Sequence, residues 1–289
     1  MTSPTRACIE SFFDAVTFTA THLVWCERAR QAAVIDSVLD YNAASGRTAT
    51  HAADRVVDFV AARGLQLQWL LETHAHADHF SAAPYLRQRL GGRIAIGRRI
   101  TELQGHFKSL FNTADMATDG APFDQLFDDG EVFAIGDLRC SVMHTPGHTP
   151  ACVSYAIGDD VFVGDTLFMP DYGSARCDFP GGDARALYTS IRRLLALPGH
   201  TRLHLCHDYQ PGGRAAVWTS TVDEQRAGNV HVREGISLED FVAMREARDK
   251  TLGTPALMLP AVQVNVRAGQ WPTPEANGLS YLKIPLNGW

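Results

Sequence analysis

The stretch of sequence that decides the fold is Glu72-Thr73-His74-Ala75-His76-Ala77-Asp78-His79. It follows a strand-like run at residues 67–73 and precedes a run typical of a helix at residues 79–90. Because His74 and His76 are separated by two residues, both imidazole rings project from the same side of an extended segment. Imidazole nitrogens and carboxylate oxygens are ligands that zinc and iron accept in proteins. A single loop histidine is usually just solvated, but this spacing of histidines and an aspartate favours a metal site.

Three later segments place the same residue types at the ends of predicted strands. His148 lies in the sharp turn Thr145-Pro146-Gly147-His148-Thr149-Pro150, Asp165 follows the apolar run Val161-Phe162-Val163, and His207 follows Leu205-Cys206. Taken alone, each residue has a structural explanation; Asp165, for example, is also a suitable cap. Four such segments in this order favour one metal site that all of them share.

Short apolar runs alternate with amphipathic stretches along the chain, which is typical of a mixed α/β fold. Strands are expected at residues 32–36, 67–73, 93–97, 131–135, 138–144, 152–157, 161–163 and 202–206. Helices are expected at residues 53–63, 79–90, in part at 98–112, at 183–197 and at 238–252. No internal repeat or linker-like tract interrupts the chain. We therefore expect a single domain over residues 1–289, with a C-terminal extension from about residue 254 that wraps the surface.

Composition and charge argue against several classes of protein. Of the 289 residues, 45% are hydrophobic and 20% are charged, which is near the average of globular proteins. The net charge of -6 argues against a nucleic-acid-binding protein that relies on bulk positive charge. No apolar run is long enough to cross a membrane, and the first residues lack the apolar core of a secretory signal. We expect a soluble, cytoplasmic protein without nucleic-acid or membrane partners; the sequence leaves open whether it forms a homodimer.

At the four segments the chain resembles the metallo-β-lactamase superfamily, whose pattern is H-x-H-x-D-H followed by a histidine, an aspartate and a histidine. The match spans roughly residues 32–210. The resemblance implies an α/β fold of four layers, the αββα sandwich, in which helices flank two facing β-sheets and the metal lies at one edge of the sheets. The strand-end positions of the candidate ligands agree with that arrangement.

Further segments are similar to the persulfide dioxygenase branch of that superfamily. They include residues 145–152 and Ala175-Arg176-Cys177-Asp178-Phe179, which corresponds to the branch's G-R-T-D-F segment with alanine for glycine and cysteine for threonine. Residues 164–173 and 281–286 resemble the bacterial β-lactamase hydrolase-like members. The resemblance thus extends over nearly the whole chain.

This resemblance implies one Fe(II) per chain, held by His74, His148 and Asp165. A facial triad of two histidines and one carboxylate leaves three coordination positions open, which suits the binding of a persulfide sulfur beside O2. The implied reaction converts glutathione persulfide, O2 and water to glutathione and sulfite. Four further residues would surround the site, orient its ligands and hydrogen-bond bound water: His76, Asp78, His79 and His207.

The resemblance also points to residues that bind the substrate. Glutathione carries two carboxylates, and Arg176 is at the position of the branch's substrate-binding arginine. A polar cluster near the end of the matched region would complete the pocket or else form a solvated face: Tyr209, Arg214, Asn229 and His231. The sequence leaves open whether Cys177 or Cys206 is redox-active.

The main alternative is a dinuclear zinc thioester hydrolase of the glyoxalase II kind. All ligand positions of that enzyme class are present in this chain, so the ligand residues by themselves do not exclude two metals. The glyoxalase II pattern has two aromatic or acidic positions after its arginine, whereas Cys177 stands directly after Arg176 in this chain. A third hypothesis is a redox or sulfide sensor that keeps the metal site without turnover. It ranks last because the sequence has no helix-turn-helix and no basic segment.

Overall fold

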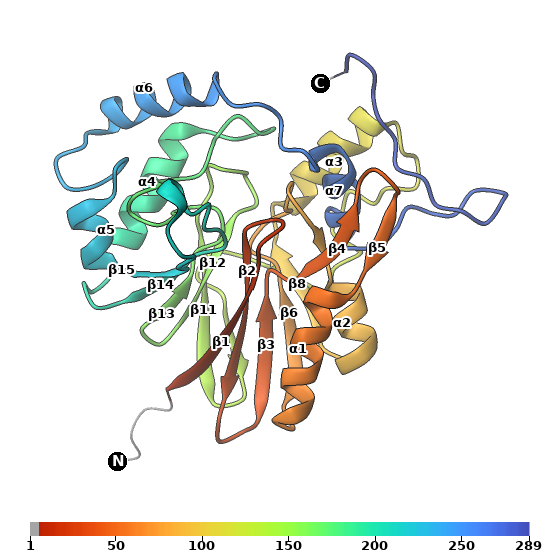
Figure 1. Ribbon diagram of the computed structural model, residues 1–289, viewed down its shortest axis with the longest axis horizontal. Helices are drawn as coiled ribbons and strands as arrows, with labels where there is room; N and C mark the ends of the chain where they lie inside the picture. Colours follow the sequence, from red (N-terminus) through yellow and green to blue (C-terminus); the bar gives the residue numbers. More distant parts are fainter. Residues whose placement is uncertain (1–5, 289) are drawn as a thin grey trace.

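The computed structural model describes residues 6–288 and shows two six-stranded β-sheets packed face to face (Figure 1). The strand order of the first sheet is β1 (Ala7–Asp14), β2 (Thr19–Cys26), β3 (Gln31–Ile35), β6 (Gln66–Leu71), β8 (Arg93–Gly97) and β9 (Gln125–Phe127). The order of the second is β10 (Val132–Ile135), β11 (Leu138–His144), β12 (Val153–Ile157), β13 (Asp160–Phe162), β14 (Arg202–His204) and β15 (Thr219–Thr221). A small third sheet joins β5 (Arg47–Ala49), β4 (Val38–Asn42) and β7 (Phe80–Ser81).

Helices pack on the outer side of each sheet. The first sheet shares an apolar cluster with α1 (His51–Ala62), α2 (Ala83–Leu90), α3 (Ile100–Phe111) and α7 (Met258–Asn265). The second shares one with α4 (Ala184–Leu195), α5 (Val222–Gly228) and α6 (Leu238–Asp249). Between the sheets lies a third apolar cluster, to which Leu71 contributes from the first sheet and Tyr155 from the second. Helix, sheet, sheet and helix thus form four layers, which confirms the αββα sandwich expected from the sequence.

Local sequence explains where two of the helices begin. The Asp183 side chain accepts a hydrogen bond from the Ala186 amide at the start of α4. The Ser237 side chain accepts one from the Asp240 amide at the start of α6. Apolar side chains then recur every three to four residues on one face of α4 and are buried against the second sheet. Within residues 6–288, no helix combines the length and the apolar character needed to cross a lipid bilayer.

The carboxyl ends of the central strands meet at one edge of the sandwich. Strands β3, β6 and β8 run parallel, as do β13 and β14. Beyond these ends, backbone hydrogen bonds join the two halves: the Ala20 amide donates to the Cys206 carbonyl (2.7 Å), and the Asp208 amide donates to the Phe18 carbonyl (3.1 Å). The loops that carry the predicted metal ligands leave this edge, which faces upward in Figure 1.

The N-terminal hairpin of β1 and β2 was not predicted. Strand β2 is buried along its whole length between β1 and β3. The turn at residues 15–18 contains neither glycine nor proline, so the usual turn signal is absent. The hydrogen bond from the Asp208 amide to the Phe18 carbonyl places this turn at the metal-binding edge.

The predicted helix at residues 79–90 starts later than expected. Phe80–Ser81 forms β7 against β4, and α2 begins only after it. A buried amide on α7 explains the difference: the Asn265 side chain donates to the His79 carbonyl (2.7 Å) and accepts from the Ser81 amide (2.9 Å). These bonds hold the backbone extended through a contact distant in sequence, which no local pattern encodes.

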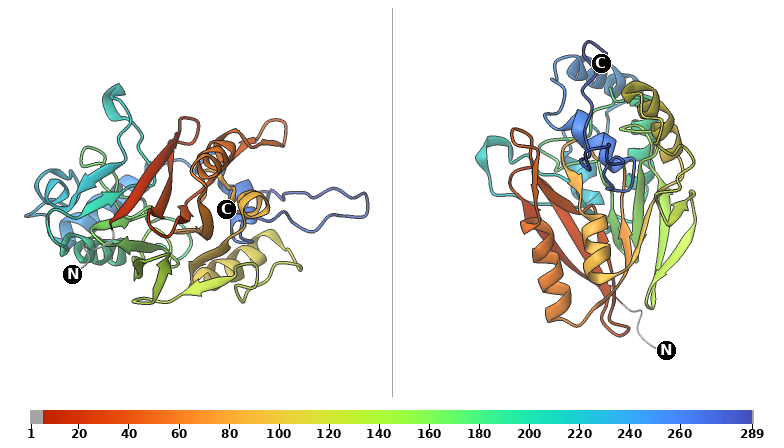
Figure 2. Two further views of the ribbon diagram at one scale, coloured as in Figure 1. Left: turned by 90° about the horizontal axis from the view of Figure 1, so that it is seen from below. Right: turned by 90° about the vertical axis from the view of Figure 1, so that its right-hand side faces the viewer.

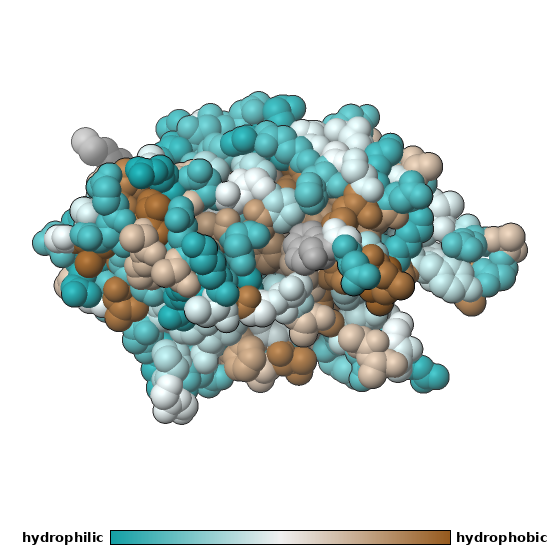
Figure 3. All heavy atoms as spheres, turned by 90° about the horizontal axis from the view of Figure 1, so that it is seen from above, coloured by the Kyte–Doolittle hydropathy of each residue, from teal (hydrophilic) through white to brown (hydrophobic). Residues whose placement is uncertain are grey.

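The C-terminal extension does not simply wrap the surface, as the sequence had suggested. Its first part forms α7, whose Val262 and Val264 are buried in the cluster beside the first sheet. Pro260 stands in the first turn of α7, where a proline is tolerated, so the helix forms in spite of the prolines in this segment. From about residue 270 the chain forms an arm that projects from the body (Figure 2). Seen from above, the arm carries both apolar and hydrophilic residues (Figure 3).

Candidate metal centre

Two histidines and an aspartate converge at the edge where the strands end. His74 follows β6, His148 lies between β11 and β12, and Asp165 follows β13. Asp165 Oδ2 lies 3.9 Å from His74 Nε2 and 3.8 Å from His148 Nε2. All three residues are buried, and their ligand atoms lie within 4.8 Å of one another. This is the separation of groups that can share one ion.

Hydrogen bonds fix which nitrogen of each histidine faces the cluster. His148 Nδ1 lies 2.8 Å from the Arg176 carbonyl, which only accepts, so this nitrogen carries the proton and Nε2 keeps its lone pair. The Thr73 hydroxyl donates to Asp36 Oδ2 (2.8 Å) and therefore accepts from His74 Nδ1 (2.9 Å). Both histidines thus present an unprotonated Nε2 to the aspartate.

A glycine allows the Asp165 loop to come this close to the end of β6. Gly164 has a φ of 53°, and a Cβ at this position would lie 2.3 Å from Thr73 Oγ1. A larger residue would displace the hydroxyl that orients His74. The pair Gly164-Asp165 therefore belongs to the site as a unit.

Burial keeps both histidines of the triad neutral. It lowers the pKa of His74 well below the usual value of a histidine, and the neighbouring His76 and His148 add to this effect. Burial likewise lowers the pKa of His148, although the Asp165 carboxylate opposes it. A neutral imidazole is the form that binds a metal ion.

Asp78, His79 and His207 form a second group next to Asp165. Asp78 Oδ2 lies 3.4 Å from both His79 Nδ1 and His207 Nε2. His207 Nε2 also lies 3.4 Å from Asp165 Oδ1. Burial by itself would raise the pKa of Asp78, but the charges of His207 and His79 outweigh burial and hold that pKa well below its usual range.

His76 is held between two carboxylates. Its Nε2 lies 3.0 Å from Asp36 Oδ1 and 3.2 Å from Glu72 Oε2. Burial disfavours the charged form of this histidine, but the two carboxylates outweigh burial and raise the pKa of His76 well above its usual value. Asp36 therefore supports two histidines of the cluster, one directly and one through Thr73.

Several buried atoms of the cluster have no hydrogen-bond partner among the residues that the structure describes: His76 Nδ1, His79 Nε2, His207 Nε2 and Asp165 Oδ1. Buried polar atoms are rarely left unpaired in proteins. A bound cation would satisfy the nitrogens of His79 and His207 and the carboxylate oxygen of Asp165, so this part of the donor set fits a metal ion. The structure brings all seven residues that the sequence singled out for the site into one cluster.

A cavity of about 530 Å³ borders the cluster, and His74, Asp78, His148 and Asp165 line its inner end. This volume is in the range of sites that enclose a small ligand. Aromatic side chains line the walls: Phe168, Tyr172, Phe179 and Tyr209. Three arginines line them as well: Arg176, Arg245 and Arg248.

Two of the residues predicted to bind substrate, Arg176 and Tyr209, line this cavity. The Tyr209 ring stacks on the His207 ring with 5.6 Å between centroids. Burial, helped by the charges of Asp165 and Asp78, raises the pKa of Tyr209 well above its usual value. The hydroxyl of Tyr209 therefore stays protonated and can donate a hydrogen bond.

The structure does not place the other three predicted substrate residues in the cavity. Arg214 forms ion pairs with two aspartates. The Asn229 side chain donates to the Gly173 carbonyl (3.1 Å), and His231 Nδ1 accepts from the Ser174 amide (3.0 Å). Burial, aided by the charges of two arginines on α6, lowers the pKa of His231 to about 4, so the ring accepts as a neutral group. Asn229 and His231 therefore hold the loop at Gly173 and Ser174 in place. Ser174 lines the cavity, but Asn229 and His231 do not.

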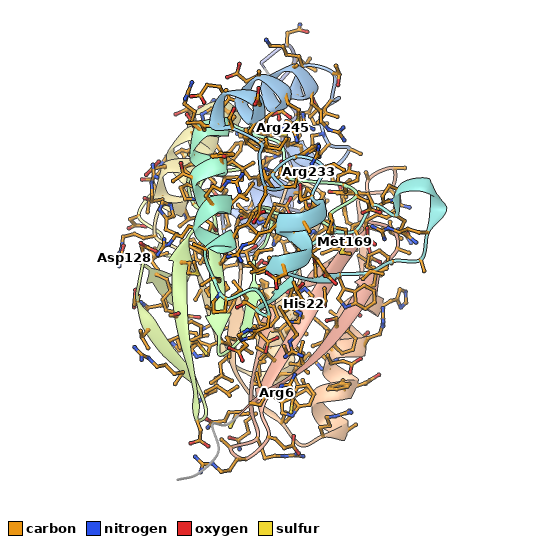
Figure 4. All side chains as sticks on the ribbon, turned by 90° about the vertical axis from the view of Figure 1, so that its left-hand side faces the viewer. Arg6, His22, Asp128, Met169, Arg233 and Arg245 are labelled. Carbon is orange, nitrogen blue, oxygen red and sulfur yellow. The ribbon has the colours of Figure 1, made fainter. Side chains whose placement is uncertain are left out.

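Sequence reasoning missed that α6 and the segment after it form one wall of the cavity. Residues 245, 248, 252 and 255–257 line it. Arg245 projects from α6 toward the body of the protein (Figure 4), where its Nη1 donates to the Ser174 carbonyl (3.2 Å). The spacing of three between Arg245 and Arg248 places both on one helix face, and this was the available signal.

Comparison with known proteins gives the site a family context. The family model described as "Metallo-beta-lactamase superfamily" matches residues 16–207, a range that includes all seven residues of the candidate metal centre. A "probable metallo-hydrolase" of Burkholderia pseudomallei is 57% identical over 96% of this chain and 99% of its own length. "Glyoxylase B2" of Dictyostelium discoideum is 46% identical over 98% of either chain. The mitochondrial persulfide dioxygenase ETHE1 of Homo sapiens is 30% identical over 92% of this chain and 90% of its own length.

Some relatives are longer than this chain. A beta-lactamase hydrolase-like protein of Xylella fastidiosa is 51% identical over 96% of this chain, which spans only 64% of that relative. Among solved structures, ETHE1 from Myxococcus xanthus superposes with a TM-score of 0.72 at 32% identity, over 91% of this chain and 100% of that one. Sequence, fold and metal cluster agree, and the chain belongs to the metallo-β-lactamase superfamily.

Proposed function

We propose that this protein is a mononuclear non-haem iron persulfide dioxygenase that acts on glutathione persulfide. One O2 and one water convert glutathione persulfide to glutathione and sulfite with release of two protons. The outer sulfur is oxidised and takes up three oxygen atoms, two from O2 and one from water, while O2 is reduced. The inner sulfur leaves as the thiol of glutathione.

The observation that carries this proposal is the triad of His74, His148 and Asp165, which lines a cavity of about 530 Å³. An iron(II) held by these residues would supply the redox chemistry between O2 and sulfur, and a site with only three protein ligands would leave room for both to bind. The similarity to the persulfide dioxygenases of Homo sapiens and Myxococcus xanthus supports the same activity.

The chain's own residues orient the ligands and supply a hydrogen-bond donor at the cavity. Asp36 and Thr73 keep the proton of His74 on Nδ1, and this leaves Nε2 free to bind a metal. The Phe179 ring meets the His148 ring edge-on with 4.8 Å between centroids, and both residues line the cavity. The protonated hydroxyl of Tyr209 is a donor for a polar group of the substrate or for water.

The test is metal content combined with two assays on one preparation. The protein is purified without oxygen and its metals are measured by elemental analysis. Oxygen uptake with glutathione persulfide is then run beside hydrolysis of S-lactoylglutathione. The proposal expects about one iron per chain, oxygen uptake and negligible thioester hydrolysis. Two zinc ions per chain with thioester hydrolysis and no oxygen uptake would refute it.

A specific observation favours a second candidate, a dinuclear zinc thioester hydrolase. His79 Nε2 and His207 Nε2 are buried without a hydrogen-bond partner among the described residues, and Asp78 lies close to both rings. A second metal would satisfy both nitrogens, and paired metals are common in hydrolases. The hydrolase and glyoxylase names of two relatives agree with this candidate. The metal count and the pair of assays separate the two candidates.

A further inference from the structure

The three arginines that line the cavity differ in how far their donors are already occupied. Arg176 Nε and Nη2 each donate to a carboxylate oxygen of Asp178 at 2.6 Å, and Nη1 donates to the Gly253 carbonyl at 2.9 Å. All three nitrogens of this guanidinium thus have partners. A substrate carboxylate would have to displace Asp178 in order to bind Arg176 in the same bidentate way.

Arg245 is also committed to the protein. It is only 1% exposed, and its Nη2 lies 2.6 Å from Asp249 Oδ1. Its Nη1 donates to the Ser174 carbonyl. On the same helix, Asp249 accepts from the Cys177 amide (2.8 Å). Arg245 and Asp249 therefore fasten α6 to the loop that forms the adjoining wall.

Arg248, one turn after Arg245, is the arginine that remains available. Its side chain is exposed, and within residues 6–288 it forms neither a hydrogen bond nor an ion pair. Its guanidinium lies 5.8 Å from the centroid of the Tyr172 ring, a contact that keeps it at the cavity. Because aspartates neutralise the other two arginines, Arg248 carries the uncompensated positive charge of this wall.

We propose that Arg248 binds a carboxylate of the substrate, while Arg176 holds the cavity wall in place. This inference rests on the proposed function in one respect, namely that the substrate is a derivative of glutathione. The cavity then has a metal-binding end where sulfur reacts and a cationic end at α6 where a carboxylate is held. A guanidinium is suited to the second task because its planar fork matches a carboxylate.

The test measures binding of glutathione itself to the iron-loaded full-length protein by isothermal titration calorimetry. Arg248→Ala should raise the Kd about 10-fold, because one charge-assisted interaction is lost at an exposed site. Arg248→Lys should recover part of the loss, since lysine keeps the charge but not the fork. Iron content and the thermal midpoint should stay at the wild-type values, because the Arg248 side chain is exposed and forms no hydrogen bond or ion pair within residues 6–288.

Two controls isolate the contact. Lys250→Ala removes the same charge just after α6 from a residue that does not line the cavity, and should change the Kd by less than about twofold. Glutathione diethyl ester, which lacks free carboxylates, should bind wild type and Arg248→Ala equally. The inference is overturned if Arg248→Ala binds glutathione as tightly as wild type, or if it loses affinity for the ester to the same extent.

Turnover distinguishes failure of this inference from failure of the proposed function. If wild type oxidises glutathione persulfide and Arg248→Ala has an unchanged KM, the carboxylate anchor is wrong and the dioxygenase proposal stands. If Arg248→Ala loses glutathione affinity but wild type takes up no oxygen with glutathione persulfide, the anchor stands and the dioxygenase proposal is wrong.

Discussion

The metal-binding edge and the α6 wall face the same cavity but are built in different ways. At the edge, residues such as His74, His148 and Asp165 are buried and leave short loops directly after strands. At the wall, Arg245 and Arg248 come from a helix outside the region that the family model matches, and one of them is exposed. The edge is fixed by backbone geometry, whereas the wall is held by arginine side chains that donate to backbone carbonyls of distant segments, Arg176 to Gly253 and Arg245 to Ser174.

This difference teaches where specificity can change. The proposed metal ligands follow strands of both sheets, so they cannot move without disturbing the sheets. The edge therefore determines which metal is bound and which reaction is possible. The wall depends on a few side-chain contacts, among them the partly exposed ion pair of Arg176 with Asp178, and such pairs contribute little to stability. A change in the wall therefore alters which molecule is bound while leaving the metal site intact.

The largest expected effect is at the edge. His148→Ala removes one of three proposed ligands, so the iron content should fall close to zero and oxygen uptake with it. His79→Ala should keep most of the iron, because His79 lies outside the triad. Elemental analysis of both variants checks this. If His79→Ala loses iron as completely as His148→Ala, the mononuclear assignment is wrong.

A smaller effect on iron binding is expected when the hydrogen bonds that orient His74 are removed. Thr73→Val removes the hydroxyl that links Asp36 to His74 and leaves both groups buried without this partner. Such supporting bonds typically account for about 10- to 100-fold in metal affinity. Iron affinity by competition with a chelator is the measurement, and Thr73→Ser, which keeps the hydroxyl, should remain near wild type. Equal loss in both variants would mean that packing, not the hydrogen bond, matters.

The wall predicts a contrast between its arginines. Arg176→Ala breaks the pair with Asp178 and the bond to the Gly253 carbonyl, so the free energy of unfolding should fall by about 1–2 kcal/mol. Arg248→Ala should change it by less than about 0.5 kcal/mol. Urea denaturation of both variants tests the contrast. If Arg176→Ala is as stable as wild type but binds glutathione poorly, Arg176 is the substrate anchor, as the family resemblance implied.

The last expected effect is a dependence of stability on pH. Burial lowers the pKa of His231 to about 4, whereas an exposed histidine in the unfolded chain titrates near 6.5. Between about pH 6.5 and 4 the unfolded chain takes up a proton that the folded protein does not. The stabilisation is therefore present above pH 6.5 and is lost as the pH falls, by at most about 1.4 kcal/mol per pH unit. His231→Gln keeps an acceptor for the Ser174 amide. Urea denaturation at pH 7 and at pH 5 should show that this variant loses less free energy of unfolding between the two pH values than wild type does. An equal loss in both proteins would assign the pH dependence to other groups, such as His22.

Much of the fold could be predicted because its signals are local. The amphipathic stretch at residues 183–197 and the short apolar runs at residues 131–163 predicted α4 and most of the second sheet close to where the structure has them. The start of α2 could not be predicted, because Asn265 holds the preceding backbone extended from the other end of the chain. The hairpin of β1 and β2 was missed because its turn lacks the residues that usually mark one.

The same difference between local signals and distant contacts separates the metal ligands from the substrate residues. The sequence by itself determined which histidines and aspartates gather, because strand ends in this fold place short motifs side by side and each motif is contiguous. It did not determine which arginine is free to bind a ligand. That depends on whether an aspartate lies within reach: Asp178 occupies Arg176, while no acid pairs with Arg248 among the described residues. Only the tertiary structure decides this, because an ion pair is a property of distances between side chains and not of their order in the chain.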